Sequence, residues 1–418
     1  MIVNKKYTNK GEIQRHLAKK KFLSPDSPGI YHGRLYKSFP PPPACVWESK
    51  EKPRQDQEAP DWLTASEYQD SPSSLEDKVE RLAGLISLSK LTVVYTGAGI
   101  STSAGVGQAA RGAGDKASGS SSTDAKPSLA HLALTALKER GLVHSWIQQN
   151  HDGLPQKAGW PQEDIIEIHG SWYDPSNPVV CYDGNLRQDL YQKIKDLEEK
   201  ADLVIVIGTT LSGLNSDGVA ARPARRSLAG KSLGTVIINL QQTRLDGEST
   251  LRIFEKADTV MEGLLTKLGV PLINCPAIHN PEYKVLVPYD RNGNKTEERL
   301  MWLDLSKGQK IRLHPSHNCQ DSQQPLYQHI GAKSPTTYRG RVRQPGAGEG
   351  TVVRFSNKNS GWDLVVEGVA MLLGGWWLQA AARGQLDTIP VINVNPEYQD
   401  RAAELVEKSE PLLARWER

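Results

Sequence analysis

Two short apolar runs constrain the fold of this 418-residue chain most, because neither alternates with polar residues. They are Leu203–Ile207 (LVIVI) and Val236–Leu240 (VIINL), and an earlier run, Leu91–Tyr95 (LTVVY), precedes them. Strands that are apolar on both sides are typical of a parallel sheet with helices on both faces. Helical patterns lie between the runs, so the sequence predicts an α/β fold with a doubly wound parallel sheet.

Composition divides the chain into three expected parts. Residues 1–73 are predicted to be an extended basic arm: residues 1–60 hold twelve Lys and Arg against six Asp and Glu. Four consecutive prolines, Pro40–Pro43, favour polyproline II and exclude the interior of a strand. Residues 74–269 are predicted to form the α/β domain, and residues 270–418 a β-rich region that ends in α/β elements.

Local patterns predict several individual elements. A helix is expected to begin at Ser74, and another is expected to end at Gly269. Segments 284–288 and 299–303 are expected to pair as a hairpin. The apolar segment 364–382 has a borderline length for a membrane span, but internal polar residues and paired glycines favour a buried helix.

A glycine turn, Gly97-Ala98-Gly99, directly follows the first apolar run. A strand that ends in Gly-x-Gly lets the backbone approach a phosphate closely and directs the first amides of the next helix toward it. Alone this signal is weak, because many strand-to-helix turns carry glycines for geometry only. Three polar motifs follow it in order: Gln149–Leu154 (QNHDGL), Glu167–Gly170 (EIHG) and Gly208–Leu211 (GTTL).

Together with Ile238-Asn239, this ordered set resembles the sirtuin family of NAD-dependent protein deacylases over about residues 75–268. The resemblance implies that the glycine turn cradles the NAD pyrophosphate and that Asn239 meets the adenosine side. A simple helix cap is the alternative role of the threonines in GTTL. The cofactor-binding residues that the resemblance implies are Gly97, Ala98, Gly99, Ser101, Gln149, Thr209, Thr210 and Asn239.

The resemblance also implies catalytic residues. His169 matches the family's general base, which takes a proton from a ribose hydroxyl, and histidine has a pKa suited to this task. Asn150 and Asp152 match the polar pair that holds the nicotinamide-ribose end.

The sequence departs from the family pattern in several places, among them His151 and Pro155 in the QNHDGL segment, and two departures bear most on function. After Val106 the family continues Pro-Asp-Phe-Arg, whereas this chain has Gln108 and Ala109 at the acidic and aromatic positions. The four cysteines form no CxxC pair, and only eight residues separate Gly170 from Val179. Because so short a segment cannot build a four-cysteine ribbon, the sequence predicts no zinc site and no other metal site.

Three functional interpretations follow from these features. The favoured one is a divergent sirtuin-like scaffold or assembly subunit that binds NAD weakly or has lost it. The alternatives are an active deacylase without zinc, and another NAD-consuming enzyme such as a glycohydrolase or ADP-ribosyltransferase. Protein partners are expected through the 1–73 arm and the C-terminal region, in a cytoskeletal assembly for example, whereas membrane and nucleic acid are not expected. The scattered cysteines and the absence of a signal-peptide pattern predict an intracellular, reducing compartment: cytoplasm, cytoskeleton or nucleus.

Overall fold

A computed structural model gives the structure of the chain, which forms two compact units. The first unit comprises residues 1–150, 158–168 and 186–275, and the second comprises 151–157, 169–185 and 276–418. The residues that the structure describes are 9–49, 63–106, 125–161, 164–170, 187–211, 215–274, 284–290, 292–296, 301–305, 308–313, 349–358, 361–366, 369–372, 381, 384, 389 and 391–393.

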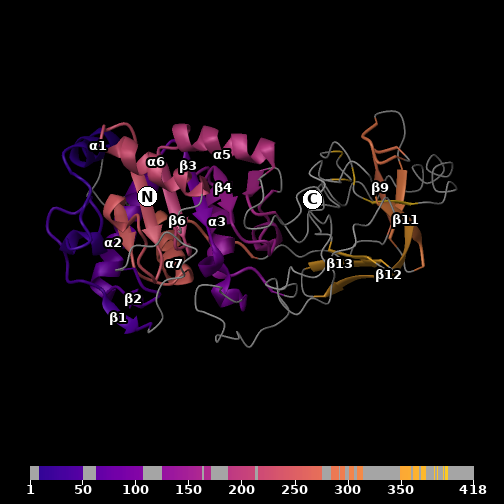
Figure 1. Cartoon of the computed structure of the whole chain (residues 1–418), viewed down its shortest axis with the longest axis horizontal. Coiled ribbons are helices and arrows are strands. Elements are labelled where there is room, and N and C mark those ends of the chain that lie inside the picture. Colours follow the sequence, from indigo (N-terminus) through magenta and orange to yellow (C-terminus); the bar gives the residue numbers. More distant parts are fainter. Residues whose placement is uncertain are drawn as a thin grey trace. The chain divides into compact units, whose positions relative to one another are not determined.

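Six parallel strands form the main sheet of the first unit, in the order β5-β4-β3-β6-β7-β8 (Figure 1). They are β3 (Thr92–Thr96), β4 (Ser145–Gln148), β5 (Ile165–Glu167), β6 (Leu203–Ile207), β7 (Gly234–Ile238) and β8 (Leu251–Ile253). The helices of this unit are α1 (Lys10–Ala18), α2 (Pro72–Leu88), α3 (Leu129–Glu139), α5 (Gln188–Lys200), α6 (Gly218–Ser227) and α7 (Ala257–Leu268). Short 3₁₀ helices are η1 (Pro28–Tyr31), η2 (Ala98–Ala104), η6 (Asn215–Asp217) and η7 (Asp246–Glu248).

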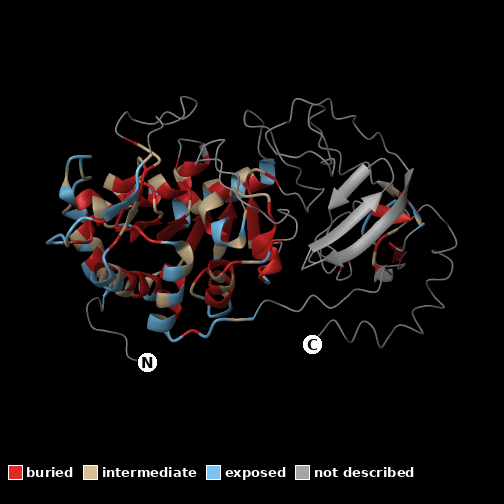
Figure 2. Ribbon diagram, turned by 90° about the horizontal axis from the view of Figure 1, so that it is seen from below, coloured by how far each residue is buried: buried red, intermediate tan, exposed pale blue. Residues whose placement is uncertain are grey.

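The strands of this sheet are buried on both faces, as Figure 2 shows by the red colour of the central strands of this unit. Alternate residues of one strand enter different cores: Ile205 belongs to the core beneath one face, and Val204 and Val206 to the core beneath the other. Helices α2, α3 and α7 contribute to the first core, and α5 and α6 to the second. The predicted doubly wound α/β fold is therefore confirmed.

The predicted helix boundaries are partly right. Helix α7 ends at Leu268, and Gly269 follows it in the left-handed conformation with φ +64°, as the sequence predicts. Helix α2 begins at Pro72 rather than at Ser74, because the Ser71 side chain caps it by accepting the Ser74 amide at 3.3 Å. Proline suits this first turn, since its missing amide proton would have no partner there.

The prediction of an extended arm is wrong for residues 9–49. Asn9 caps helix α1, whose Ile13 and Leu17 are buried in the core of the first unit. Further on, the amides of Arg34 and Leu35 donate to carbonyls at Ser249 and Thr250, at 3.0 and 2.9 Å. The proline run suggested an extended chain, but the N-terminal residues cover the β8 end of the sheet. The described part of residues 1–73 also includes the antiparallel pair of strands β1 (Ala44–Trp47) and β2 (Glu67–Gln69).

His32 makes the stability of this N-terminal packing depend on pH. Burial, together with the nearby charge of Lys78, lowers its pKa from 6.5 to about 4. The folded state therefore favours neutral His32, so its contribution is complete above pH 6.5 and is lost as pH falls toward 4. The free energy of unfolding should drop by up to about 3 kcal/mol over that interval. Urea titrations at both pH values should show this drop, and His32→Phe should reduce it; an equal pH dependence in the variant would contradict the assignment.

The second unit contains antiparallel strands. Strands β9 (Lys284–Val287) and β10 (Met301–Asp304) pair as the predicted hairpin. A five-stranded sheet has the order β14-β13-β12-β11-β15. Its strands are β11 (Lys310–Leu313), β12 (Glu349–Lys358), β13 (Gly361–Val366), β14 (Val369–Leu372) and β15 (Val391–Asn393), and the described residues of this unit also include helix α4 (Leu154–Lys157).

One prediction for the C-terminal region is wrong. Segment 364–382 was expected to be helical, but its first part lies in β13 and β14, where Val366 pairs with Val369. Branched valines favour such a pairing over a helix. Strand β15 lies where a strand was expected and pairs antiparallel with β11, whereas the closing helix expected after it falls outside the described residues. Among the described residues, no helix has both the length and the apolar character needed to cross a bilayer.

Candidate functional site

The chain order of the main sheet creates a switch point between β3 and β6. From β3 the chain adds β4 and β5 on one side, and from β6, which pairs with the other side of β3, it adds β7 and β8 in the opposite direction. Ligands of open α/β sheets bind at such a point, beyond the carboxyl ends of the strands. Gly97 follows β3 and Gly208 follows β6 at this edge, and Asn239 follows the neighbouring strand β7.

Two glycine turns pack directly against each other at the switch point. A Cβ added to Gly99 would lie 2.6 Å from the Cα of Gly208, and one added to Gly97 would lie 2.7 Å from the Gln149 Oε1. Gly208 itself has φ +65°, in the region that favours glycine. Glycines are therefore required here for close packing of the two backbones.

Three amides of the first turn donate within the protein. The Gly97 amide donates to the Ile207 carbonyl at 3.0 Å, the Gly99 amide to the Gly208 carbonyl at 2.8 Å, and the Ile100 amide to the Gly97 carbonyl at 3.2 Å. The first two bonds hold the turn on the end of β6. These three amides already have acceptors, so they are not free donors for a phosphate.

Asn150 and Ser101 join the glycine turn to the end of β4. The Asn150 Nδ2 donates to the Gly97 carbonyl at 3.2 Å and to the Ser101 Oγ at 3.0 Å. Three of the residues singled out from the sequence therefore lie together, although about 50 positions separate Asn150 from the other two.

A buried polar cluster beneath this turn was not predicted from the sequence. The Gln149 Nε2 donates to the Tyr95 hydroxyl, which donates to the Asp217 Oδ1 at 2.9 Å and lies 3.1 Å from the Ser216 Oγ. Burial raises the pKa of Tyr95 well above 10, and Asp217 raises it further, so the phenol stays protonated. A tyrosine inside an apolar strand was the available signal, because a buried hydroxyl requires a partner.

Replacing Tyr95 by Phe should disturb both the fold and the candidate site. Asp217 would lose a buried donor and Gln149 its acceptor, which should cost about 1–3 kcal/mol of unfolding free energy. Urea titration measures this loss. Tyr191→Phe on α5 is the matched control, because that side chain lies outside the cluster; an equal effect at both positions would argue against a role of the cluster.

The GTTL motif follows β6 in a strained turn. Leu211 is buried and has φ +53°, which is uncommon for a residue with a branched side chain. The Thr209 Oγ1 accepts the Leu211 amide at 3.3 Å, so this threonine stabilises the turn locally. Thr210 is half-buried beside it. Such strain is commonly found at functional sites.

Two further predicted residues, Asp152 and His169, belong to the second unit. The Asp152 Oδ1 accepts the Leu154 amide at 3.1 Å, at the start of α4. The ring of His169 lies 6.3 Å from that of His151, whose Nδ1 is 2.8 Å from the Gly170 carbonyl oxygen. Burial lowers the pKa of His151, although the Gly170 carbonyl acts in the opposite direction, so this histidine favours the neutral state.

Two of the departures from the family pattern, at Gln108-Ala109 and at the missing zinc ribbon, lie outside the described residues. Gln108 and Ala109 fall within 107–124, and the segment that replaces the zinc ribbon falls within 171–186. Within the part of the chain that the structure describes, no group of three or more His, Cys, Asp or Glu could hold a metal ion.

Comparison with known proteins agrees with this geometry. The model of the Sir2 family matches residues 115–177. The Drosophila melanogaster NAD-dependent protein deacetylase Sirt6 is 31% identical over 262 residues, which cover 50% of this chain and 81% of the fly protein. The chain belongs to the Sir2 family.

Other Sir2 relatives match a similar share of this chain. Human NAD-dependent protein deacetylase sirtuin-7 is 27% identical over 274 residues, which cover 52% of this chain and 67% of sirtuin-7. The mouse protein is 29% identical, and 63% of its length is covered. The chain thus matches about two thirds of these mammalian relatives. A solved complex titled "Sir2-p53 peptide-NAD+" is 26% identical, and the match covers 46% of this chain and 99% of that one, with a TM-score of 0.40.

Proposed function

We propose that this Sir2-family chain binds NAD at the switch point of its parallel sheet and has weak or no lysine deacylase activity. The observation that carries the proposal is the close packing of Gly99 on Gly208, with Gln149 and Asn150 beside the turn. A side chain at Gly97 or Gly99 would meet Gly208 or Gln149, so the glycines let two turns pack together at the sheet edge where α/β domains bind dinucleotides.

The residues that would hold NAD are those that the resemblance assigns. Gly97, Ala98 and Gly99 would receive the pyrophosphate, and the residues after β7 would receive the adenosine half. NAD would supply the anomeric carbon that accepts an acyl oxygen. The low activity follows from Gln108 and Ala109, which replace the family's acidic and aromatic residues near the nicotinamide.

An active deacylase is the second candidate. It is favoured by the retention of His169, Asn150 and Asp152, and by the similarity to relatives named as NAD-dependent protein deacetylases. A scaffold role, with protein partners in an intracellular assembly, accompanies the first candidate. In the described part of the N-terminal segment, Phe39, Val46 and Trp47 are exposed large hydrophobic residues available for such contacts.

Calorimetric titration with NAD and with ADP-ribose tests the binding proposal. We expect both to bind with dissociation constants of about 1 mM, close to −4 kcal/mol. Absence of binding at several millimolar would refute it. Turnover of acylated peptides distinguishes the two candidates: turnover that disappears in His169→Ala would favour the active deacylase, whereas turnover at the background level supports the first proposal.

A further inference from the structure

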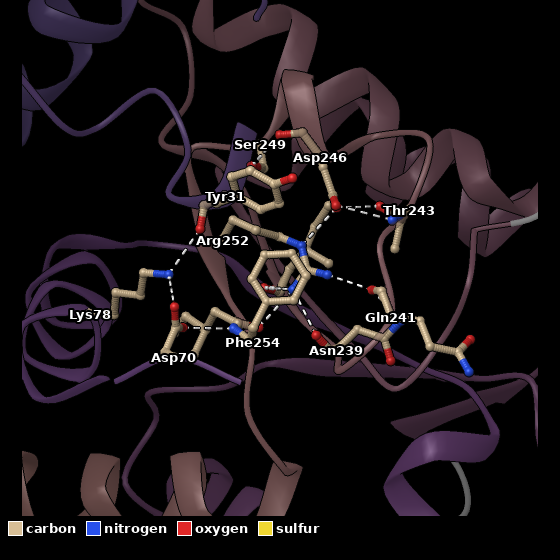
Figure 3. Close-up of polar contacts among 12 residues, drawn as sticks. Tyr31, Asp70, Lys78, Asn239, Gln241, Thr243, Asp246, Ser249, Arg252 and Phe254 are labelled. Atoms are coloured by element: carbon tan, nitrogen blue, oxygen red, sulfur yellow. Dashed lines mark hydrogen bonds and ion pairs between the residues drawn. The ribbon is translucent and has the colours of Figure 1, made fainter. Parts of the chain in front are cut away.

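The loop after β7 is held by one buried arginine on the neighbouring strand. Arg252 of β8 has no exposed surface. Its Nη1 donates to the Asn239 carbonyl at 2.9 Å, and its Nη2 donates to the Gln241 carbonyl at 2.5 Å (Figure 3). Two backbone carbonyls at the start of the loop, here residues 239–246, therefore accept from the same guanidinium.

The same guanidinium also fixes the end of the 239–246 loop. The Arg252 Nε donates to the Asp246 Oδ1 at 2.7 Å. Asp246 in turn accepts the Thr243 hydroxyl at 2.6 Å and the Thr243 amide at 3.1 Å. The ion pair thus connects the beginning, middle and end of the loop, as Figure 3 shows.

Packing fixes the plane of the guanidinium. The ring centroid of Phe254 lies 3.5 Å from the Arg252 Cζ, and the Nη1 also donates to the Ile253 carbonyl at 2.7 Å. Arginine suits this position because its planar group presents five donors in fixed directions, whereas lysine has a point charge. Apolar residues often replace a buried ion pair without loss of stability. Stability alone therefore does not explain why this strand carries Arg252.

The position of the loop relates it to the candidate site. Asn239 follows β7 at the sheet edge where Gly97 and Gly208 follow β3 and β6. Its side-chain Nδ2 donates to the Gln241 carbonyl at 3.0 Å, and this carbonyl also accepts from Arg252. The orientation of the Asn239 side chain therefore depends on the bonds that Arg252 makes.

We propose that Arg252, paired with Asp246, is a positioning residue that holds the 239–246 loop in the conformation that receives the adenosine half of NAD. The inference rests on the proposed NAD binding and adds the residues that organise one part of the site. Arg252 is buried beneath the loop and acts through the backbone of Asn239 and Gln241.

The test compares Arg252→Lys with a control at the adjacent buried ion pair. Lys78 and Asp70 are also fully buried, 2.6 Å apart, and Lys78 donates to the Tyr31 carbonyl rather than to the loop. We expect Arg252→Lys to weaken NAD and ADP-ribose about tenfold, because a loop that is competent one tenth of the time raises the apparent dissociation constant by that factor. Lys78→Met should lower the melting temperature yet leave both affinities unchanged. An equal loss of affinity in Lys78→Met would overturn the proposal.

A second readout needs no nucleotide. Hydrogen exchange of the Thr243 amide, which donates to Asp246, should accelerate at least tenfold in Arg252→Lys and stay unchanged in Lys78→Met. Unchanged exchange in Arg252→Lys would refute the positioning role. If the wild-type chain fails to bind NAD while exchange accelerates as expected, the proposed function is wrong and the control of the loop by Arg252 stands.

A milder variant covers the case in which Arg252→Lys does not fold. Thr243→Val removes only the hydroxyl that donates to Asp246 and keeps the shape of the side chain. We expect the affinity for ADP-ribose to fall about threefold, with Thr243 amide exchange accelerated, because the loop loses one of its four hydrogen bonds to the ion pair. Unchanged affinity and unchanged exchange in this variant would contradict the proposal.

Discussion

Removal of residues 1–36 is expected to abolish cooperative folding of the first unit. Five large apolar or aromatic side chains in the described part of this segment are buried: those of Ile13, Leu17, Ile30, Leu35 and Tyr36. Burial of such side chains contributes roughly 1.5–3 kcal/mol each, hence about 10 kcal/mol together. This equals the whole stability of an ordinary domain, which is about 5–15 kcal/mol.

Backbone pairing adds to this expected effect. The N-terminal segment supplies two amides that bond to Ser249 and Thr250, and the His32 carbonyl accepts the Arg252 amide at 3.1 Å. Truncation would uncover these groups at the β8 end of the sheet, where unpaired strand edges promote aggregation. Urea titration followed by near-ultraviolet circular dichroism should show no cooperative transition in the truncated chain.

The same leucine-to-alanine substitution at a buried and at an exposed position provides the control for the truncation. Leu17→Ala, at a residue with 0% exposure, should cost about 2–5 kcal/mol of unfolding free energy. Leu272→Ala, at a residue with 46% exposure, should change it by less than about 0.5 kcal/mol. A truncated chain that unfolds cooperatively with unchanged stability would show that the segment is a detachable arm, as the sequence alone suggested.

The sheet was predictable from the sequence because the apolar pattern of each strand lies within a few consecutive residues. The LVIVI run of β6 and the start of the β7 run at Val236 must bury both faces of each strand, and only helices on both sides of a parallel sheet allow this. The N-terminal segment was mispredicted because its structure depends on distant residues. Helix α1 buries only Ile13 and Leu17, and both pack on a surface that chain segments far away provide.

The candidate site was predictable in part, for the same reason. Its glycines and the Asn150 motif are short patterns that follow strands, so sequence order was sufficient to group them. The supporting residues Tyr95, Asp217 and Arg252 have no such pattern. Tyr95 and Asp217 meet across 122 positions of the sequence, and Arg252 donates to the Asn239 and Gln241 carbonyls as well as to Asp246. Only the fold shows that these groups meet.

Gly208→Ala is expected to be the most damaging single substitution at the candidate site. A Cβ at Gly208 would lie 2.5 Å from the Ile100 nitrogen and 2.6 Å from the Gly99 Cα, both backbone atoms that cannot move aside without opening the turn. The left-handed conformation at φ +65° adds about 1–2 kcal/mol of strain for alanine. With roughly 1–3 kcal/mol for the steric overlap, the total loss should be about 2–5 kcal/mol.

Gly141→Ala separates strain from steric overlap. Gly141 has almost the same backbone conformation, φ +68°, but a Cβ there would meet nothing within 4 Å. Its substitution should therefore cost only the strain, about 1–2 kcal/mol, and should leave NAD affinity unchanged. The difference between the two variants in urea titrations measures how tightly the two turns pack. Equal costs would mean that Gly99 and Gly208 do not need to pack this closely, and the argument for a backbone surface shaped to receive NAD would then fail.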